Sequence, residues 1–309
     1  MKVCIVIGGA GFIGRHVVKL LCESGRNVIV LGRSPQPDRS LDQRCRYISG
    51  DYGNRAVLRN ILSAGAEVID LAYSTVPKTS YDDAAFDLIS NLPASVGLFQ
   101  ECIAVGVGKL IVVSSGGTVY GPTTENLINE NHSLSPVSPY GITKMTTDRY
   151  ALMFHRNNKL PVVIVRPANA YGREQRSGTG QGFIANAIDA ILSDRDVEVY
   201  GVNGTIRDYI HVIDIASGLM AALKFGENGQ IYNLGTGIGT SNAEIIEMLK
   251  IFALKDGIMV RTKILPMRNF DVEANILDST KIIKLCGWKP EITLFNGLRE
   301  MWNERKSKI

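Results

Sequence analysis

The feature that most constrains the fold is a glycine-rich turn near the start of the chain. An apolar run, KVCIVIG, leads directly into GGAGFIG, in which Gly8, Gly11 and Gly14 recur at every third residue, and a helical stretch over 12–24 follows. Glycines at a strand–helix junction let the backbone approach a pyrophosphate at the helix N-terminus. The segment therefore predicts a dinucleotide-binding strand, turn and helix.

Short apolar runs then alternate with helical stretches through the first half of the chain. Apolar runs without strict polar alternation are typical of strands buried on both faces of a parallel sheet. We expect strands at 2–8, 27–32, 46–51, 67–73, 109–115 and 161–167, with helices that include 12–24 and 84–106. The predicted fold class is α/β, a Rossmann-type doubly wound parallel sheet with right-handed crossovers.

The alternation changes after about residue 167. A polar, glycine-rich loop over 171–182 precedes a helical segment at 183–193. Further strands are expected at 197–201, 206–212 and 230–235, and further helices at 241–253 and 279–285. We expect a nucleotide-binding Rossmann domain over 1–166 and a smaller C-terminal substrate-binding lobe over 167–309. This lobe is partly interleaved with the sheet and closes over its carboxyl edge, where ligands of such sheets bind.

Composition narrows the classes of partner. The chain is 45% hydrophobic and 21% charged, which is ordinary for a soluble globular protein. The net charge of +4 comes from scattered basic residues, so no nucleic acid is expected as a partner. Five dispersed cysteines and four unclustered histidines predict no metal site and a reduced, cytoplasmic compartment. The N-terminal apolar run is too short for a signal peptide, and no membrane insertion is expected.

The segment SPYGITK carries candidate catalytic residues. Tyr140 and Lys144 are four residues apart, and on a helix this spacing puts both side chains on one face. An ammonium group near a phenol stabilises the phenolate and lowers its pKa toward the range of a general base. The pair therefore indicates proton transfer.

Six motifs now stand in order along the chain: GGAGFIG, SSGGTVYG, SPYGITK, RPANAYG, RDYIHVID and YNLGTG. Over essentially the whole chain they resemble the extended short-chain dehydrogenase/reductases, in the nucleotide-sugar epimerase/dehydratase family. The resemblance is greatest to the UDP-glucose 4-epimerase-like members. It implies that Tyr140 transfers the proton and that Lys144 binds the nicotinamide ribose and tunes the tyrosine.

The resemblance also implies a third catalytic residue, a Ser or Thr. Its usual place, three residues before the VYG of SSGGTVYG, is occupied by Gly116. Ser115 and Thr118 are the hydroxyls on either side, and either one could bond the sugar oxygen as its charge changes.

Further residues follow from the motifs and the resemblance. Guanidinium groups suit a diphosphate because they form paired hydrogen bonds with its oxygens. The hexose pocket is expected around Thr75, Val76 and Pro77 and the loop 171–183. The expected substrate contacts are Thr75, Asn169, the base-stacking Tyr200, and the diphosphate-binding Arg207 and Arg268. The expected cofactor contacts are Gly8, Gly11, Phe12, Ile13, Gly14, Arg33, Asp51, Tyr52, Leu71, Ala72, Tyr73, Asn91, Ser114, Tyr140, Lys144 and Pro167.

The segment VLGRSP bears on the choice between NAD and NADP. An acidic residue usually ends the second strand of such a sheet and binds the adenosine ribose in NAD-binding members, but this chain has Gly32 and Arg33 there. Without a carboxylate to repel it, a 2′-phosphate of NADP could bind Arg33. Arg33 could equally stack on adenine beside NAD, and Asp38 lies a few residues further on. NAD is the expected cofactor, and NADP stays open.

Three functions remain. Residues 114–121 contain no Asp or Glu, whereas the resembling dehydratases and a decarboxylase need carboxyl groups there. The favoured function is a UDP-hexose-type 4-epimerase that oxidises carbon 4 transiently with bound NAD. The alternative is an NADPH-dependent reductase of a nucleotide 4-keto-6-deoxy-sugar, and a non-catalytic cofactor-binding protein is the third. The partner is a nucleotide-diphosphate sugar, and a homodimer is expected through helices near 84–106 and 138–156.

Overall fold

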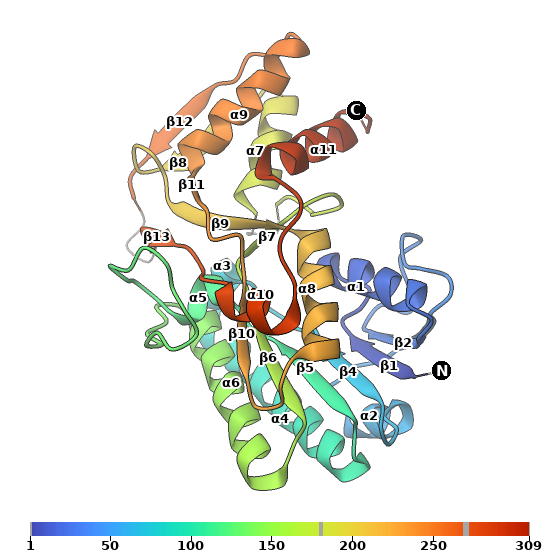
Figure 1. Ribbon diagram of the computed structural model, residues 1–309. Coiled ribbons are helices and arrows are strands. Elements are labelled where there is room, and N and C mark those ends of the chain that lie inside the picture. The colour runs from blue at the N-terminus through green and yellow to red at the C-terminus, as the bar shows by residue number, and fades with distance from the viewer. Residues whose placement is uncertain (1, 179–181, 268–271, 309) are drawn as a thin grey trace.

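The computed structural model describes residues 2–178, 182–267 and 272–308. In this part of the chain a seven-stranded parallel sheet runs in the order β10-β6-β5-β4-β1-β2-β3 (Figure 1). Its strands are β1 (Val3–Ile7), β2 (Asn27–Gly32), β3 (Arg46–Ser49), β4 (Glu67–Asp70), β5 (Lys109–Val113), β6 (Val162–Pro167) and β10 (Ile231–Leu234). The predicted α/β, Rossmann-type fold class is confirmed.

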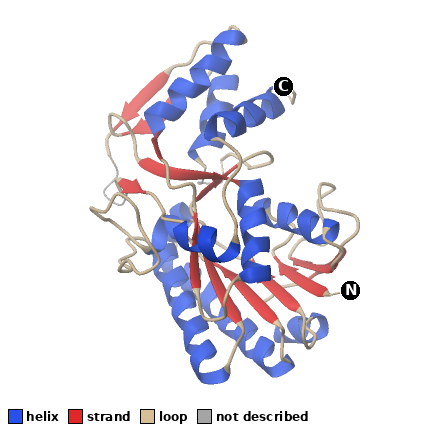
Figure 2. Cartoon of the chain, in the orientation of Figure 1, coloured by secondary structure: helices blue, strands red, loops and turns tan. Residues whose placement is uncertain are grey.

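Helices cover both faces of the sheet (Figure 2). One face packs against α1 (Phe12–Glu23), α8 (Val212–Phe225) and α10 (Thr280–Cys286), and the other against α2 (Arg55–Ile61), α4 (Ala84–Val105) and α6 (Pro139–Asn158). In β1, Cys4 and Val6 belong to the first core, and Ile5 and Ile7 belong to the second. This period of two with apolar residues on both faces is the reason that the run lacks polar alternation.

The strand expected at 230–235 does not belong to the smaller lobe. It forms β10 and pairs in parallel with β6, with Ile231 opposite Ile164 and Leu234 opposite Pro167. The physical reason is burial: helix α8 returns the chain along the sheet, and Tyr232 and Leu234 then bury against the core of that face. The sheet therefore contains strands from both sides of residue 166 in the sequence. A domain boundary at that residue stays a prediction.

The smaller lobe lies beyond the carboxyl end of the sheet (Figure 1). It has its own apolar core, which includes Ile188, Leu249 and Trp302. Its helices are α7 (Phe183–Leu192), α9 (Asn242–Lys255) and α11 (Leu294–Lys306), and its strands are β8 (Val197–Tyr200), β9 (Ile206–His211), β11 (Gly239–Ser241), β12 (Thr262–Leu265) and β13 (Ala274–Asn275). Strand β7 (Asn169–Tyr171) pairs with β9 and leads from the sheet into the lobe. Short helices α3 (Pro77–Asp82) and α5 (Gly116–Val119) lie in the loops at the sheet edge.

Helix α4 bears on the expectation that the chain does not insert into a membrane. With 22 residues it is, by length and composition, the single helix among the described residues that could cross a membrane. Core helices of soluble proteins also meet that criterion. Here α4 packs on α6 and α2 and carries the buried acids Asp87 and Glu101, of which Glu101 pairs with Arg55 and Arg59 on α2.

Candidate active site

The glycine-rich turn has the geometry of a dinucleotide cradle. Gly8 has a φ of 77°, and a Cβ there would lie 3.0 Å from the Ala72 nitrogen in the loop after β4. A Cβ at Gly14 would lie 2.5 Å from the Gly8 oxygen, so α1 approaches the turn this closely only with glycine at residue 14. Helix α1 begins at Gly11 with no side-chain cap and no acidic residue in its first turn. An uncapped helix N-terminus beside a tight turn fits a pyrophosphate.

Tyr140, Lys144 and Ser115 converge at the carboxyl end of β5. Helix α6 begins where Ser138 accepts a hydrogen bond from the Gly141 N–H, at 3.1 Å, and this start sets Tyr140 and Lys144 on one helix face. Burial raises the pKa of Tyr140, a hydrogen bond with the Ser115 side chain lowers it, and the charge of Asp87 raises it. Lys144 Nζ lies 5.9 Å from the centre of the Tyr140 ring.

The Lys144 ammonium is buried among aromatic and acidic groups. It donates to the Val113 carbonyl at 2.9 Å and lies 4.1 Å from the centre of the Tyr73 ring. Burial lowers the pKa of Lys144 to about 8, and the charges of Asp70, Asp148 and Asp87 oppose that shift, in this order. With a pKa of about 8, the Lys144 ammonium keeps its proton at neutral pH but loses it more readily than an ordinary lysine. The three acids oppose that loss.

Asp70 and Asp87 are candidate functional residues that were not expected from the sequence. Both carboxyl groups are buried, one at the end of β4 and the other in the first turn of α4. A signal was present for each: Asp70 is an acid that ends an otherwise apolar strand run, and Asp87 lies four residues before Asn91 on one helix face. Only the folded chain brings both near Lys144, because β4, α4 and α6 are separate elements.

Asn91 and Asp87 hold the loop after β4 in place. The Ser74 N–H donates to Asn91 Oδ1 at 2.8 Å, and Asn91 Nδ2 donates to the Asp87 carbonyl at 2.7 Å. The Thr75 hydroxyl donates to the Asp87 carboxylate. These bonds fix the segment 73–75 beside Tyr140, whose ring lies 4.8 Å from that of Tyr73.

Leu277 explains why residue 116 is glycine. A Cβ at Gly116 would lie 2.4 Å from Leu277 Cδ1 and 3.0 Å from the Arg166 carbonyl, so a serine there would require the buried Leu277 side chain to shift. Of the two flanking hydroxyls, Ser115 forms no cap bond to helix α5, and its side chain lies near enough to Tyr140 to lower the pKa of that phenol. Thr118 Oγ1 and Asn169 Nδ2 are buried polar atoms with no hydrogen-bond partner in the described part of the protein. Buried polar atoms without a partner are uncommon in folded proteins, so these two are candidates for bonding a polar ligand.

The candidate residues on the adenosine side lie apart from Tyr140, at the ends of β2 and β3. Arg33 and Asp51 are exposed and Tyr52 is buried. Burial raises the pKa of Tyr52, and the nearby charge of Arg33 opposes this. Asp38 accepts both the N–H and the hydroxyl of Ser40, each at 2.9 Å.

Two candidate substrate residues belong to the lobe. Tyr200 ends β8, and Arg207 in β9 donates to the Ile206 carbonyl at 2.8 Å. The adjacent Asp208 is buried and accepts from the Thr236 and Gly237 N–H groups. Arg268 and residues 179–181 of the expected pocket loop lie outside the described residues. Pro167, the last candidate, ends β6.

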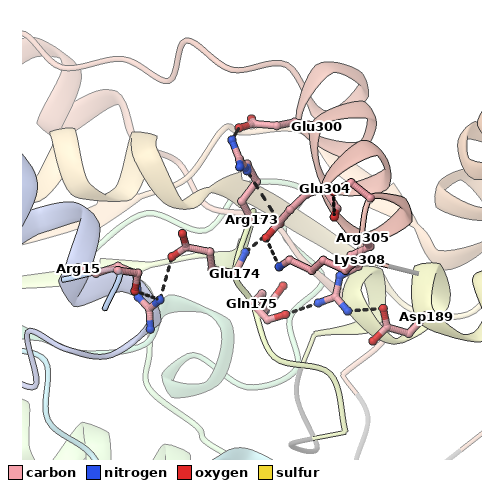
Figure 3. A network of polar contacts seen from close by, with 11 residues as sticks. Arg15, Arg173, Glu174, Gln175, Asp189, Glu300, Glu304, Arg305 and Lys308 are labelled. Carbon is pink, nitrogen blue, oxygen red and sulfur yellow. Dashed lines mark hydrogen bonds and ion pairs between the residues drawn. The ribbon is translucent and has the colours of Figure 1, made fainter. Parts of the chain in front are cut away.

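A polar network joins the cofactor turn to the lobe (Figure 3). Arg15, one residue after Gly14, donates to Ser40 at 2.6 Å and to Glu174 at 2.9 Å, and it also bonds the Ala10 and Gly11 carbonyls. Glu174 has a φ of 65°, and its N–H donates to Glu304 of α11 at 3.1 Å. Figure 3 shows the loop that carries Glu174 between the side chains of α11 and Arg15.

Two further observations concern metals and cysteines. Within residues 2–178, 182–267 and 272–308, no group of three or more His, Cys, Asp or Glu side chains is arranged to hold a metal ion. All five cysteines are described, and each is a free thiol.

Comparisons with known proteins agree with this geometry. The model of the NAD dependent epimerase/dehydratase family matches residues 4–235. A putative UDP-glucose 4-epimerase of Methanocaldococcus jannaschii is 29% identical over 98% of both chains, and a dTDP-4-dehydro-6-deoxyglucose reductase of Escherichia coli is 27% identical over 96% of this chain and 95% of that one. Among solved structures, Thermotoga maritima UDP-glucose 4-epimerase with UDP-glucose superposes with a TM-score of 0.92 at 30% identity, over 99% of both chains. The Thermus thermophilus UDP-glucose 4-epimerase complex with NAD superposes with a TM-score of 0.91 at 28% identity, over the full length of both.

Proposed function

This chain belongs to the NAD-dependent epimerase/dehydratase family, and from that premise we propose that it is a nucleotide-sugar 4-epimerase of the UDP-hexose type that works with bound NAD. The relatives and solved structures named for UDP-glucose 4-epimerase, which match nearly the whole chain, support the epimerase. The absence of any Asp or Glu between residues 114 and 121 argues against dehydration.

The residues that would contact the cofactor lie in three parts of the chain. The turn from Gly8 to Gly14 and the uncapped start of α1 would hold the pyrophosphate, and Lys144 would hold the nicotinamide ribose. Bound NAD would supply the chemistry of taking a hydride from carbon 4 of the sugar and returning it to the other face of that carbon. Leu71, Ala72 and Tyr73 would lie beside the bound NAD.

The protein's own contribution is proton transfer at the sugar 4-hydroxyl. Tyr140 would take this proton and later return it, and the Ser115 hydroxyl would bond the same oxygen as its charge changes. Because burial raises the pKa of Tyr140, the phenolate needs nearby positive charge, which the Lys144 ammonium provides. The acids around Lys144 keep that ammonium charged.

Substrate binding would divide between the two halves of the molecule. Thr75, which bonds Asp87, and Asn169, whose side-chain amide lies beside Gly117, would contact the hexose or its phosphate. Tyr200, Arg207 and Arg268 would bind the base and the diphosphate from the lobe. A hexose held mainly through its diphosphate can turn over in the pocket, which epimerisation at one carbon requires.

The observation that carries the proposal is that Tyr140 and Lys144 of α6 meet Ser115 at the turn 114–121, which contains no Asp or Glu. The test incubates the purified protein with UDP-galactose and UDP-glucose, without added nucleotide, and follows their interconversion by chromatography. Mass spectrometry of the denatured protein identifies the bound nucleotide. Interconversion with NAD retained is the expected result. Cofactor binding without turnover of any nucleotide sugar would indicate the non-catalytic alternative instead.

A second candidate is an NADPH-dependent reductase of a nucleotide 4-keto-6-deoxy-sugar. The exposed Arg33 after Gly32, where a carboxylate is lacking, favours it, and so does the reductase relative of Escherichia coli. Stoichiometric consumption of NADPH with a 4-keto sugar would separate it from the epimerase, which consumes no cofactor.

We also propose a homodimer in the cytoplasm. Helices α4 and α6 pack side by side and expose large apolar residues, among them Phe86 (53%), Ile89 (67%) and Ile142 (46%). Pairing of these faces in two copies would form a four-helix contact and cover the apolar surface. Light scattering of the purified protein measures the mass. The free thiols suit a reducing compartment.

A further inference from the structure

The end of β2 is occupied by a side chain from the neighbouring strand. A Cβ at Gly32 would lie 2.7 Å from the Tyr47 hydroxyl oxygen and 3.0 Å from Tyr47 Cε2. Real Cβ atoms essentially never make a contact as short as 2.7 Å, so any side chain at residue 32 would require the end of the Tyr47 side chain to shift. The Tyr47 hydroxyl thus lies where the first atoms of a residue-32 side chain would be.

The position of Tyr47 follows from the strand register. Tyr47 lies opposite Val30 in the parallel pair of β2 and β3, and its ring packs against the core that also contains Val30. Its hydroxyl donates to the Ser34 carbonyl at 2.8 Å, just past the carboxyl end of β2. Burial raises the pKa of Tyr47, so the hydroxyl keeps its proton at neutral pH.

We propose that the Tyr47 hydroxyl replaces the missing carboxylate as the partner of the adenosine ribose. This assignment rests on the proposed function, because it requires that a dinucleotide binds along the glycine turn. In NAD-binding sheets of this kind an acidic side chain at the end of β2 accepts a hydrogen bond from the ribose 2′-hydroxyl. The Tyr47 oxygen gives its one proton to Ser34 and keeps lone pairs, so it can accept that same hydrogen bond.

The same hydrogen-bond polarity separates NAD from NADP. A ribose hydroxyl can donate to the Tyr47 oxygen, whereas a 2′-phosphate has only acceptors to offer and would need the proton that Ser34 receives. Asp38, the acid that follows Arg33 in the sequence, accepts both Ser40 hydrogen bonds at its oxygen Oδ1. Tyr47 therefore favours NAD even though Arg33 follows Gly32, and Arg33 is then a partner for adenine.

The test is a double-mutant cycle between a protein hydroxyl and a nucleotide hydroxyl. Isothermal titration calorimetry on the full-length, nucleotide-freed protein compares NAD, NADP and NAD that lacks the adenosine 2′-hydroxyl, in the wild type and in Tyr47→Phe. The wild type should bind NAD roughly 5- to 10-fold more tightly than the 2′-deoxy analogue, as expected for one hydrogen bond. Tyr47→Phe should abolish that preference, and NADP should bind the wild type more weakly than NAD.

Tyr232→Phe is the matched control. Tyr232 belongs to β10, at the opposite edge of the sheet, and its hydroxyl accepts a hydrogen bond from the Glu227 N–H at 3.0 Å. Loss of this hydroxyl should therefore leave the affinity for all three nucleotides unchanged. Two results would overturn the role of Tyr47 without touching the proposed function. One is a preference for the 2′-hydroxyl that survives in Tyr47→Phe, and the other is tighter binding of NADP than of NAD by the wild type. A wild type that binds no dinucleotide would overturn the proposed function as well.

Discussion

Arg15 and Glu174, 159 residues apart in the chain, form an ion pair of 2.9 Å between the first turn of α1 and the loop after β7 (Figure 3). Only 13% of the Arg15 side chain is exposed, against 34% for Glu174. The pair therefore connects the proposed cofactor cradle to the loop that leads into the lobe.

Replacing Glu174 with Gln should destabilise the protein by less than about 1 kcal/mol, because solvent screens a partly exposed pair. The loss should shrink in high salt. Urea unfolding of Arg15→Gln, Glu174→Gln and the double variant measures the coupling. The double variant should be no less stable than Arg15→Gln alone, and fully additive losses would mean that the two charges do not interact.

Tyr140→Phe should reduce the interconversion of UDP-sugars by roughly 10²- to 10⁴-fold, since it removes the proposed proton-transfer group. The phenyl ring preserves the contact with Tyr73, so the fold and the bound nucleotide should remain. Initial rates and nucleotide content are measured on the same preparation. A variant that turns over like the wild type would exclude Tyr140 from proton transfer.

Ser115→Ala should impair turnover more than Thr118→Ala. The Ser115 side chain lowers the pKa of Tyr140, so its removal should raise that pKa and move the rate profile to higher pH. Rates from pH 6 to pH 10 test the shift in both variants. Equal profiles for Ser115→Ala and the wild type, with a shift in Thr118→Ala, would exchange the roles of the two hydroxyls.

Gly116→Ser should destabilise the protein by about 1–3 kcal/mol, because the new Cβ overlaps Leu277. Combining it with Leu277→Ala opens that space, so the serine should then harm stability less than it does in the wild-type background. Thermal unfolding of the two single variants and the double variant measures this. Strictly additive losses would show that Leu277 does not dictate glycine at this position.

Asp70 should make the stability of the nucleotide-free protein depend on pH. Burial raises the pKa of Asp70 from 3.8 to about 6, against the opposing charge of Lys144. The folded state thus holds this proton more tightly than the unfolded state. Its contribution is complete below pH 3.8 and is lost as the pH rises through 6.

Relative to Asp70→Asn, the wild type should therefore lose up to about 3 kcal/mol of unfolding free energy between pH 4 and pH 7. Asp38→Asn is the control, because hydrogen bonds from Ser40 lower the pKa of Asp38. The contribution of Asp38 to the unfolding free energy should therefore be lost as the pH falls, which is the opposite of Asp70. Urea titrations at each pH measure both differences. A flat difference between the wild type and Asp70→Asn would mean that Asp70 titrates normally.

The sequence by itself determined most of the sheet and the outline of the site. All six apolar runs of the first half form strands. Those that form β1, β4, β5 and β6 are buried on both faces and have few alternatives to a central parallel strand, whereas β3 lies half-exposed at the edge of the sheet. The glycine spacing determined the turn before α1, and the spacing of Tyr140 and Lys144 determined that they share a helix face. These are local properties of backbone freedom and helical period.

Only the tertiary structure decided which distant residues meet. It moved the strand 231–234 from the lobe into the sheet, and it brought Asp70 and Asp87 from different elements to Lys144. It also set Leu277 against Gly116 and Tyr47 against Gly32. Each of these contacts is made between side chains from two segments that are distant in the sequence, and it depends on the volume and charge of both side chains. The spacing of residues within one segment does not encode such a contact.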